Sequence, residues 1–207
     1  MYTPPFFKQD RAASLKFADA RGFGTMCAFD GKKPIASALP FYLTYADDGT
    51  PQAVFHVARH NPLLKLADGA TSWLLAVNGP DAYVSPDWYA TQGRVPTWNY
   101  IAVEGRGAAR RMDGDELRRL LVDLSASEEN KLLPKKPWTI DKVPEEKMGG
   151  LLRAIAGFSV RFETLEGKFK LSQNVALEDF EGAFRGLVRR SDDESLAVAR
   201  AMGNLER

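Results

Sequence analysis

The chain has 207 residues, 44% apolar and 27% charged, which are the proportions of an ordinary globular protein with one main hydrophobic core. Its 28 Lys and Arg residues nearly balance its 27 Asp and Glu residues, so the net charge favours neither a nucleic acid nor a membrane surface as partner. The N-terminal residues lack the basic and apolar parts of a secretory signal, and no apolar run could span a bilayer. The single cysteine, Cys27, excludes an internal disulfide and suits a reducing compartment, so we expect a cytoplasmic protein.

The first half of the chain predicts a meander of antiparallel strands. Asp30-Gly31 and Asp48-Gly49 supply the positive φ that tight turns require. Pro40 would interrupt the ladder of a central strand, so we expect it at an edge, at a bulge, or where a ligand meets the backbone. The runs rich in β-branched and aromatic residues predict six strands, at 25–29, 35–43, 52–57, 73–77, 82–85 and 98–103.

The second half predicts helices packed on the strands. Leucines at 117, 120, 121 and 124 have helical spacing, and Asp113 with Glu116 resembles a capping box at the start of that helix. A second helix is expected from Pro144 to Gly157, followed by a strand over 158–162. Further helices are expected around 180–188 and after a cap at 191–194. The predicted class is therefore mainly β with peripheral helices (α+β), with a domain over 1–175 and a helical segment over 176–207.

Motifs for common chemistries are absent from the sequence. There is neither a phosphate loop of the nucleotide-triphosphatase type nor a GxGxxG fingerprint. His56 and His60 have a spacing found in metal sites, but a strand and a helix flank them and no cysteine or carboxylate is near, so we expect no metal. Cys27 has no cationic neighbour and is interpreted as a structural thiol. Ser85, Asp87 and His56 could form a triad, but their spacing does not require one, and the catalytic residues are left unassigned.

The segment 55–65 is typical of a strand end, a polar turn and the start of a helix. Such a junction directs backbone N–H groups and a positive helix end at one point, around which Arg59, His60 and Asn61 add donors. This pattern predicts a phosphate site. The alternative is that Arg59 and His60 are solvated and that Asn61 only caps the helix.

Several further motifs follow one another along the chain: Met1-Tyr-Thr-Pro4, the run from His56 to Pro62, Gly79–Tyr89, Val95–Tyr100 and Lys170-Leu-Ser-Gln-Asn174. Together they resemble the PaiB family, which is described as FMN-binding negative transcriptional regulators. The resemblance implies an FMN-binding split β-barrel that works as a homodimer, with flavin at the subunit interface.

The resemblance also implies which residues meet the cofactor FMN. His56 and Val57 with Arg59, His60 and Asn61 match the segment that binds the flavin phosphate and edge, although Ala58 and His60 stand where the wider fold has serine and lysine. Ser37, Leu39 and Pro40 match the strand along the isoalloxazine ring. Trp98, Asn99 and Tyr100 match a strand from the second subunit, although the large aromatic residues there could equally form barrel or dimer core. Lys170 and Gln173 are expected to face the flavin or its ligand, unless their loop only satisfies its own backbone.

The function that the resemblance implies is a flavin-dependent regulator or oxidoreductase. A haem-binding or haem-degrading split barrel is an alternative, in which His56 or His60 would be the axial ligand. A DNA-binding repressor is another, but the charge does not support nucleic-acid binding and no helix-turn-helix is evident. One modest basic cluster is interpreted as a solvated face; it comprises Arg106, Arg110, Arg111, Arg118 and Arg119.

Overall fold

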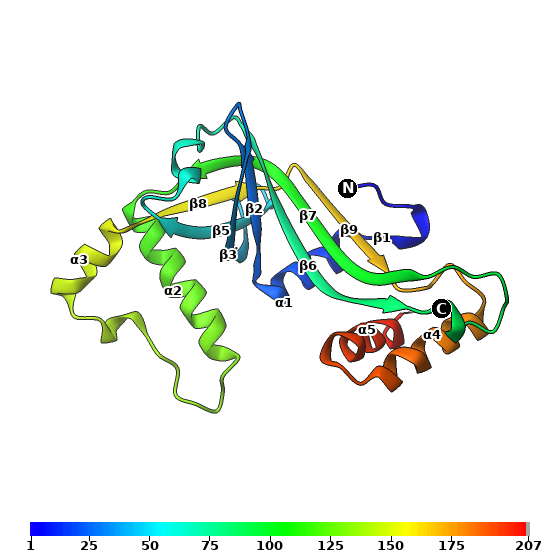
Figure 1. Cartoon of the computed structure of the whole chain (residues 1–207). Helices are drawn as coiled ribbons and strands as arrows, with labels where there is room; N and C mark the ends of the chain where they lie inside the picture. Colours follow the sequence, from blue (N-terminus) through cyan, green and yellow to red (C-terminus); the bar gives the residue numbers. More distant parts are fainter. Residues whose placement is uncertain (206–207) are drawn as a thin grey trace. The chain divides into compact units, whose positions relative to one another are not determined.

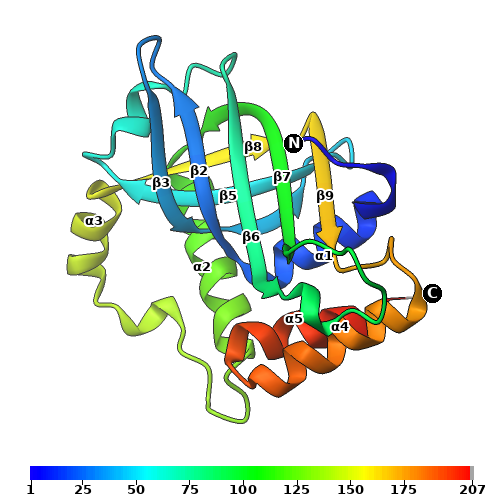
Figure 2. The ribbon, with the colours of Figure 1, turned by 45° about the vertical axis from the view of Figure 1, so that its right-hand side comes forward.

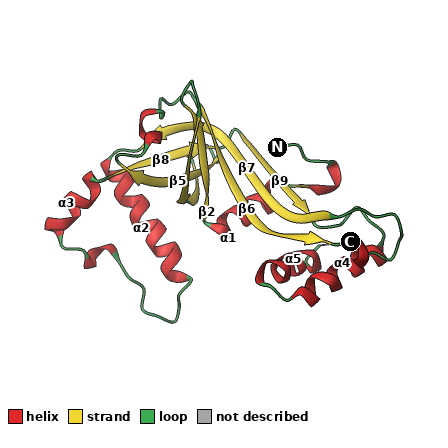
Figure 3. Cartoon of the chain, viewed as in Figure 1, coloured by secondary structure: helices red, strands yellow, loops and turns green. Residues whose placement is uncertain are grey.

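The computed structural model describes residues 1–205, which form nine strands and five α-helices (Figure 1). The strands pair in the order β3-β2-β6-β7-β8-β5-β4, and β9 pairs with β1 and with β7. The strands are β1 (Lys8–Gln9), β2 (Phe23–Phe29), β3 (Pro34–Pro40), β4 (Tyr42–Tyr45), β5 (Pro51–Ala58), β6 (Ser72–Val84), β7 (Thr97–Arg111), β8 (Ile155–Arg161) and β9 (Thr164–Lys170). The helices are α1 (Arg11–Arg21), α2 (Gly114–Asn130), α3 (Glu145–Arg153), α4 (Leu177–Arg190) and α5 (Asp193–Gly203), and Figure 3 distinguishes them from the strands by colour.

The chain forms two compact units, and the long strands β6 and β7 contribute residues to both. Unit 1 comprises residues 1–17, 77–104 and those from Glu166 onward. Unit 2 comprises Ala18–Ala76 and Gly105–Leu165. The domain boundary expected at residue 175 stays a prediction.

Unit 2 holds the hairpin-connected strands of the predicted meander. Asp30-Gly31 and Asp48-Gly49 make its turns, with φ of 86° at Gly31 and 78° at Gly49. Its core includes a cluster of three rings, in which Trp73 and Phe55 lie 5.7 and 5.8 Å from Phe158 between ring centroids. On the other face of β5, Val54 packs against Leu117 and Leu120 of α2. The predicted capping box is present, since the Asp113 carboxylate accepts from the Glu116 N–H and the Glu116 carboxylate accepts from the Asp113 N–H.

The single strand predicted over 35–43 is wrong, because the chain breaks at Phe41 into β3 and β4. Phe41 donates its N–H to the Gly22 carbonyl at 2.9 Å and is only 2% exposed, so its side chain enters the core where the two strands part. Pro40 is the last residue of β3, and β3 stands at one end of the strand order. The expectation that Pro40 lies at an edge is confirmed.

The two strands predicted at 73–77 and 82–85 are one strand, β6. Gly79 does not break it, because a Cβ there would lie 2.5 Å from the Phe17 ring and 2.9 Å from the Ile101 Cβ. Glycine is needed at this position for close packing within unit 1 rather than for a turn. Similarly, the helix expected from Pro144 to Gly157 ends at Arg153, and Gly157 lies in β8.

Unit 1 has its own core between the strands and the C-terminal helix pair. Val84 of β6 and Ile101 of β7 pack with Leu187 of α4 and with Val198 and Met202 of α5. Figure 2 shows α4 and α5 side by side. Asp192 caps α5 by accepting from the Ser195 N–H, whereas Ser191 ends α4 with a φ of 53°.

Candidate functional site

The predicted phosphate segment lies where β5 ends in unit 2. Arg59 is exposed, and its side chain reaches the start of β8, where Nε donates to the Arg153 carbonyl at 2.6 Å and Nη2 donates to the Ile155 carbonyl at 2.8 Å. A guanidinium has five N–H groups, so donors remain for a ligand. The helix expected after Asn61 is only a 3-10 turn over Pro62–Lys65, so a long helix does not contribute a positive end here.

Asn61 joins this segment to the edge strand β3. Its Nδ2 donates to Ser37 Oγ at 2.9 Å, and its Oδ1 accepts from the Leu63 N–H at 3.0 Å. Asn61 therefore caps the turn, as the alternative interpretation expected, and also fixes Ser37 beside it. Leu39 and Val57 are buried, so only their backbone could meet a ligand, whereas Pro40 and His60 are exposed.

His56 points to the opposite face of β5 from the ring cluster. Its register partner on β8 is Gly157, and Nδ1 is buried without a hydrogen-bond partner among the described residues. Burial lowers the pKa of the imidazole, so the neutral form is favoured. A buried polar nitrogen without a partner is unsatisfied, and a bridging water or a ligand atom would satisfy it.

An open pocket of 590 Å³ lies at this end of unit 2. Its apolar lining comes from Met112, Leu117, Leu152, Ile155 and Ala156. Its polar lining includes Arg59, Arg110, Arg111, Asp113, Glu116 and Arg153. The bidentate contact from Arg110 and the bond from the Asp113 N–H lower the pKa of the Glu116 carboxyl to about 2, so this carboxylate stays ionised at neutral pH.

Sequence reasoning did not assign Arg110, Arg111 and Arg153 to a site. The first two were interpreted as a solvated face, and Arg153 lay in a predicted helix interior. Only the fold shows that the ends of β5, β7 and α3 meet at one pocket. The clustering of two adjacent arginines at a strand end was the one signal available in the sequence.

The remaining predicted residues lie in unit 1. Asn99 is fully buried, with Nδ2 donating to Ser172 Oγ at 2.9 Å and approaching Met202 Sδ at 3.5 Å. Ser172 has a φ of 62°, which an L-residue rarely adopts and which this buried hydrogen bond helps to hold. The Asn99 side chain therefore lies in the interior of unit 1, where it is hydrogen-bonded.

The side chains of Lys170 and Gln173 also form hydrogen bonds with neighbouring residues of unit 1. Lys170 Nζ donates to Thr97 Oγ1 and to the Trp98 carbonyl, and burial, followed by the charge of Lys168, lowers its pKa. Gln173 accepts from the Leu171 N–H at 2.7 Å and donates to the Phe169 carbonyl at 2.6 Å, so it closes its own loop. Roles for these two residues at a flavin stay predictions.

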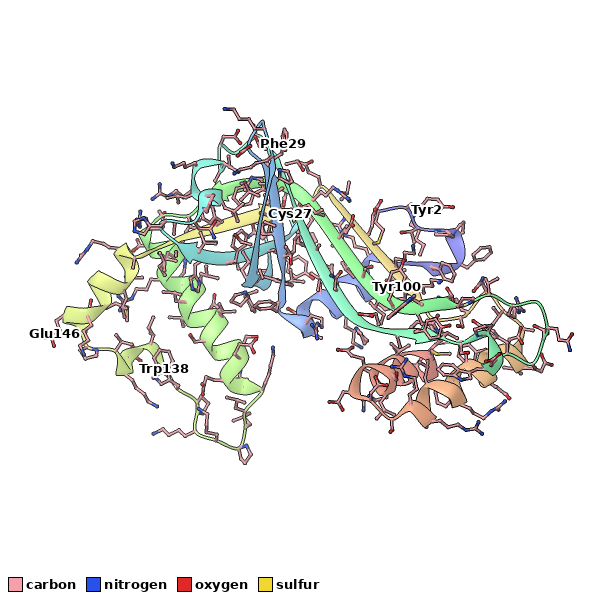
Figure 4. All side chains as sticks on the ribbon, viewed as in Figure 1. Tyr2, Cys27, Phe29, Tyr100, Trp138 and Glu146 are labelled. Atoms are coloured by element: carbon pink, nitrogen blue, oxygen red, sulfur yellow. The ribbon has the colours of Figure 1, made fainter. Side chains whose placement is uncertain are left out.

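Two aromatic residues of the predicted site remain accessible. Trp98 is 51% exposed and packs edge to face with Tyr83 at 6.1 Å between ring centroids. Tyr100, labelled on β7 in Figure 4, has Lys168 Nζ at 5.3 Å from its ring centroid. Cys27, also labelled, is half-buried in β2 and forms no disulfide within the described part of the chain.

Within residues 1–205, no group of three or more His, Cys, Asp and Glu side chains could hold a metal ion. No helix in the same range is long and apolar enough to cross a membrane.

Residues 1–164 match a family model described as "Putative FMN-binding domain". The chain belongs to this family. It is 31% identical over 98% of its length to Protease synthase and sporulation protein PAI 2 of Bacillus subtilis, 96% of which is covered. It is also 29% identical over 81% of its length to an uncharacterized Aspergillus fumigatus protein, 81% of which is covered. The resemblance to the PaiB family inferred from the motifs is confirmed.

Solved structures of low sequence identity share the fold. The FAD and haem binding protein from Mycobacterium smegmatis gives a TM-score of 0.56 at 15% identity, covering 78% of this chain and 71% of that one. The flavocytochrome Anf3 from Azotobacter vinelandii gives a TM-score of 0.54 at 16% identity, covering 79% of this chain and 69% of that one. The expected fold, a split β-barrel with peripheral helices, is confirmed.

Proposed function

We propose that this chain binds FMN at the end of β5 and exchanges electrons through it. The observation that carries the proposal is the position of Arg59, which lines the pocket and has guanidinium donors to spare. The chain that carries it belongs to a family of FMN-binding domains. A guanidinium is suited to a phosphate because its planar set of N–H groups can bond two oxygens together.

The residues of unit 2 fit a flavin mononucleotide. Arg59 would hold the phosphate, and the Ser37 hydroxyl, positioned by Asn61, is a donor for the polar edge of a ring. The exposed edge strand ending at Pro40 offers backbone to a flat ring. Bound FMN would supply hydride or electron transfer, and the protein's part is to hold and orient it.

The binding proposal is tested by comparing FMN with riboflavin, which lacks the phosphate. We expect Arg59→Ala to cost about 1.5–3 kcal/mol of FMN binding, because a charge-assisted hydrogen bond is lost. This corresponds to roughly ten- to a hundred-fold in Kd, measured by flavin fluorescence titration. Riboflavin should bind weakly and be unaffected, and Arg189→Ala, at an exposed arginine of α4, should behave as wild type. Equal losses for FMN and riboflavin would place Arg59 away from the phosphate.

Whether the protein works as an oxidoreductase or as a flavin-dependent regulator is decided by its reactivity. An enzyme with an accessible flavin should be reduced by NADH or NADPH in stopped-flow bleaching of the flavin band and reoxidised by a small quinone. If neither nicotinamide reduces the bound flavin at a useful rate, the regulatory role is favoured. Homodimerisation and a cytoplasmic location remain part of this proposal.

Haem binding is a second candidate, favoured by the unpartnered His56 Nδ1 and by the haem-binding solved structures that share the fold. Under this candidate, His56 would supply an axial nitrogen. Titration with haemin tests it, since a Soret band that His56→Ala removes would support an axial His56. An unchanged band in His56→Ala would exclude His56 as the ligand.

A further inference from the structure

Four arginines from segments far apart in the sequence line one pocket of unit 2. Arg59 follows β5, Arg110 and Arg111 end β7, and Arg153 ends α3. The whole chain has a net charge of only +1, so this is a local concentration of positive charge rather than a consequence of composition. Guanidinium groups that share a pocket repel one another, and an anion relieves that repulsion.

The charges of the pocket are only partly compensated. Arg110 is neutralised by Glu116, which both of its terminal nitrogens contact, at 2.9 and 2.6 Å. The second acid, Asp113, accepts from the Glu116 N–H at 2.8 Å and keeps its charge, so the four arginines and two acids of the lining leave a net charge of +2. Arg59 bonds only carbonyl groups, and the side chains of Arg111 and Arg153 form no ion pair with any residue from 1 to 205. Three arginines of the lining, Arg59, Arg111 and Arg153, therefore have no ion pair of their own within residues 1–205.

The pocket is larger than one phosphate needs. Its 590 Å³ is lined in part by apolar residues that include Met112 and Leu152, so it suits an organic molecule with a charged end. The two phosphates of a diphosphate diester carry about −1 each, so together they would balance the net +2 of the lining. They also spread that charge over more oxygens than one phosphate does, which suits arginines that come from three different segments.

We propose that this pocket binds a diphosphate group through Arg59, Arg111 and Arg153. The diphosphate could belong to the flavin, which would then be bound as a dinucleotide such as FAD, or to a separate nucleoside diphosphate. The first of these sources, a flavin dinucleotide, rests on the proposed flavin binding. The proposed affinity of the pocket for a diphosphate does not depend on flavin binding.

The direct test is isothermal titration with inorganic pyrophosphate on the full chain without flavin. Wild type should bind it, and the double variant Arg111→Ala/Arg153→Ala should bind it at least about ten-fold more weakly, because two charge-assisted contacts are lost. Both positions are exposed, and circular dichroism checks that the variant is folded. Arg189→Ala removes one positive charge outside the pocket, and its affinity should equal that of wild type.

Three results would overturn the proposal. They are no binding by wild type at millimolar pyrophosphate, equal binding by the double variant, and inorganic phosphate binding as tightly as pyrophosphate. Because this titration contains no flavin, its outcome is independent of whether the chain binds FMN.

A second set of titrations identifies the source of the diphosphate. If saturation with FMN blocks pyrophosphate, and FAD binds more tightly than FMN only while Arg111 and Arg153 are present, the diphosphate belongs to the flavin. If FMN-saturated protein still binds pyrophosphate and ADP, the ligand is a separate nucleoside diphosphate. Either result supports the pocket as a diphosphate site.

Discussion

At the scale of single residues, the buried carboxylate of Asp179 on α4 in unit 1 has a full set of hydrogen-bond partners. It is fully buried, accepts from the Thr91 N–H at 2.9 Å and from Thr91 Oγ1 at 2.7 Å, and pairs with Arg94. Burial alone would raise the pKa of this carboxyl, but the bonds from Thr91 and Arg94 outweigh it and hold the pKa at about 2. Asp179 thereby ties the loop between β6 and β7 to α4.

This pKa gives a prediction for acid stability. The native pKa of Asp179, about 2, lies below its usual value of 3.8, so the stabilisation from its ionised carboxylate is complete above about pH 5 and is lost as the pH falls through 3.8 to about 2. Asp179→Asn should lower Tm at pH 6, and its deficit relative to wild type should shrink toward pH 2. Thermal melts by circular dichroism from pH 2 to 6 measure this.

The matched control is Asp81→Asn. The side chain of Asp81 is exposed and makes no hydrogen bond or ion pair within residues 1–205. The Tm of the Asp81→Asn variant should stay near that of wild type. A constant deficit of Asp179→Asn at every pH would show that its effect does not come from ionisation.

At the same scale, the sequence pointed to Arg59 and Asn61 but not to their partners. The type and spacing of these residues predicted a polar junction after a strand, and that junction exists. It could not predict that Arg153, 94 residues away, lines the same pocket and gives its carbonyl to Arg59, because that requires β5 and β8 to pair. Likewise, no local pattern indicates that Asn99 is buried against Ser172.

At the scale of elements, strong local signals predicted the fold well. The capping box of α2 and the Asp-Gly turns are satisfied by neighbouring residues, so they need no tertiary information. Helix α1 was missed because its buried positions are small, Ser14 and Ala18, and so give no aliphatic periodicity. The break between β3 and β4 was missed because Phe41 continues an apolar run, and only the packing of its ring ends the strand.

Glycines in helices provide a test of packing at this scale. A Cβ at Gly182 of α4 would lie 1.9 Å from the Trp88 carbonyl oxygen, whereas a Cβ at Gly150 of α3 would meet nothing within 4 Å. Gly150→Ala should stabilise the protein by up to about 1 kcal/mol through helix propensity. Gly182→Ala should instead destabilise it by about 1–3 kcal/mol, because backbone must move.

Urea unfolding of the two variants measures both effects. If Gly182→Ala stabilised the protein as much as Gly150→Ala, the close contact between α4 and Trp88 would be contradicted.

At the scale of the whole molecule, we expect a homodimer. The paired rings of Trp98 and Tyr83 in unit 1 are 51% and 37% exposed, and aromatic residues of this kind are enriched where protein surfaces associate. A stable dimer should bury more than about 1,200 Å² in total. Sedimentation at micromolar concentration should give twice the chain mass of 22.9 kDa, and Trp98→Asp should shift it toward the monomer. A monomeric wild type would refute the expectation.

The central claim, that the chain is a flavoprotein, is tested most directly by the absorption spectrum of the protein after addition of FMN and gel filtration. We expect the flavin bands to elute with the protein at about one FMN per chain, with the flavin fluorescence altered by the protein. A protein fraction without flavin bands, from a sample that is folded by circular dichroism and was mixed with excess FMN, would contradict the claim.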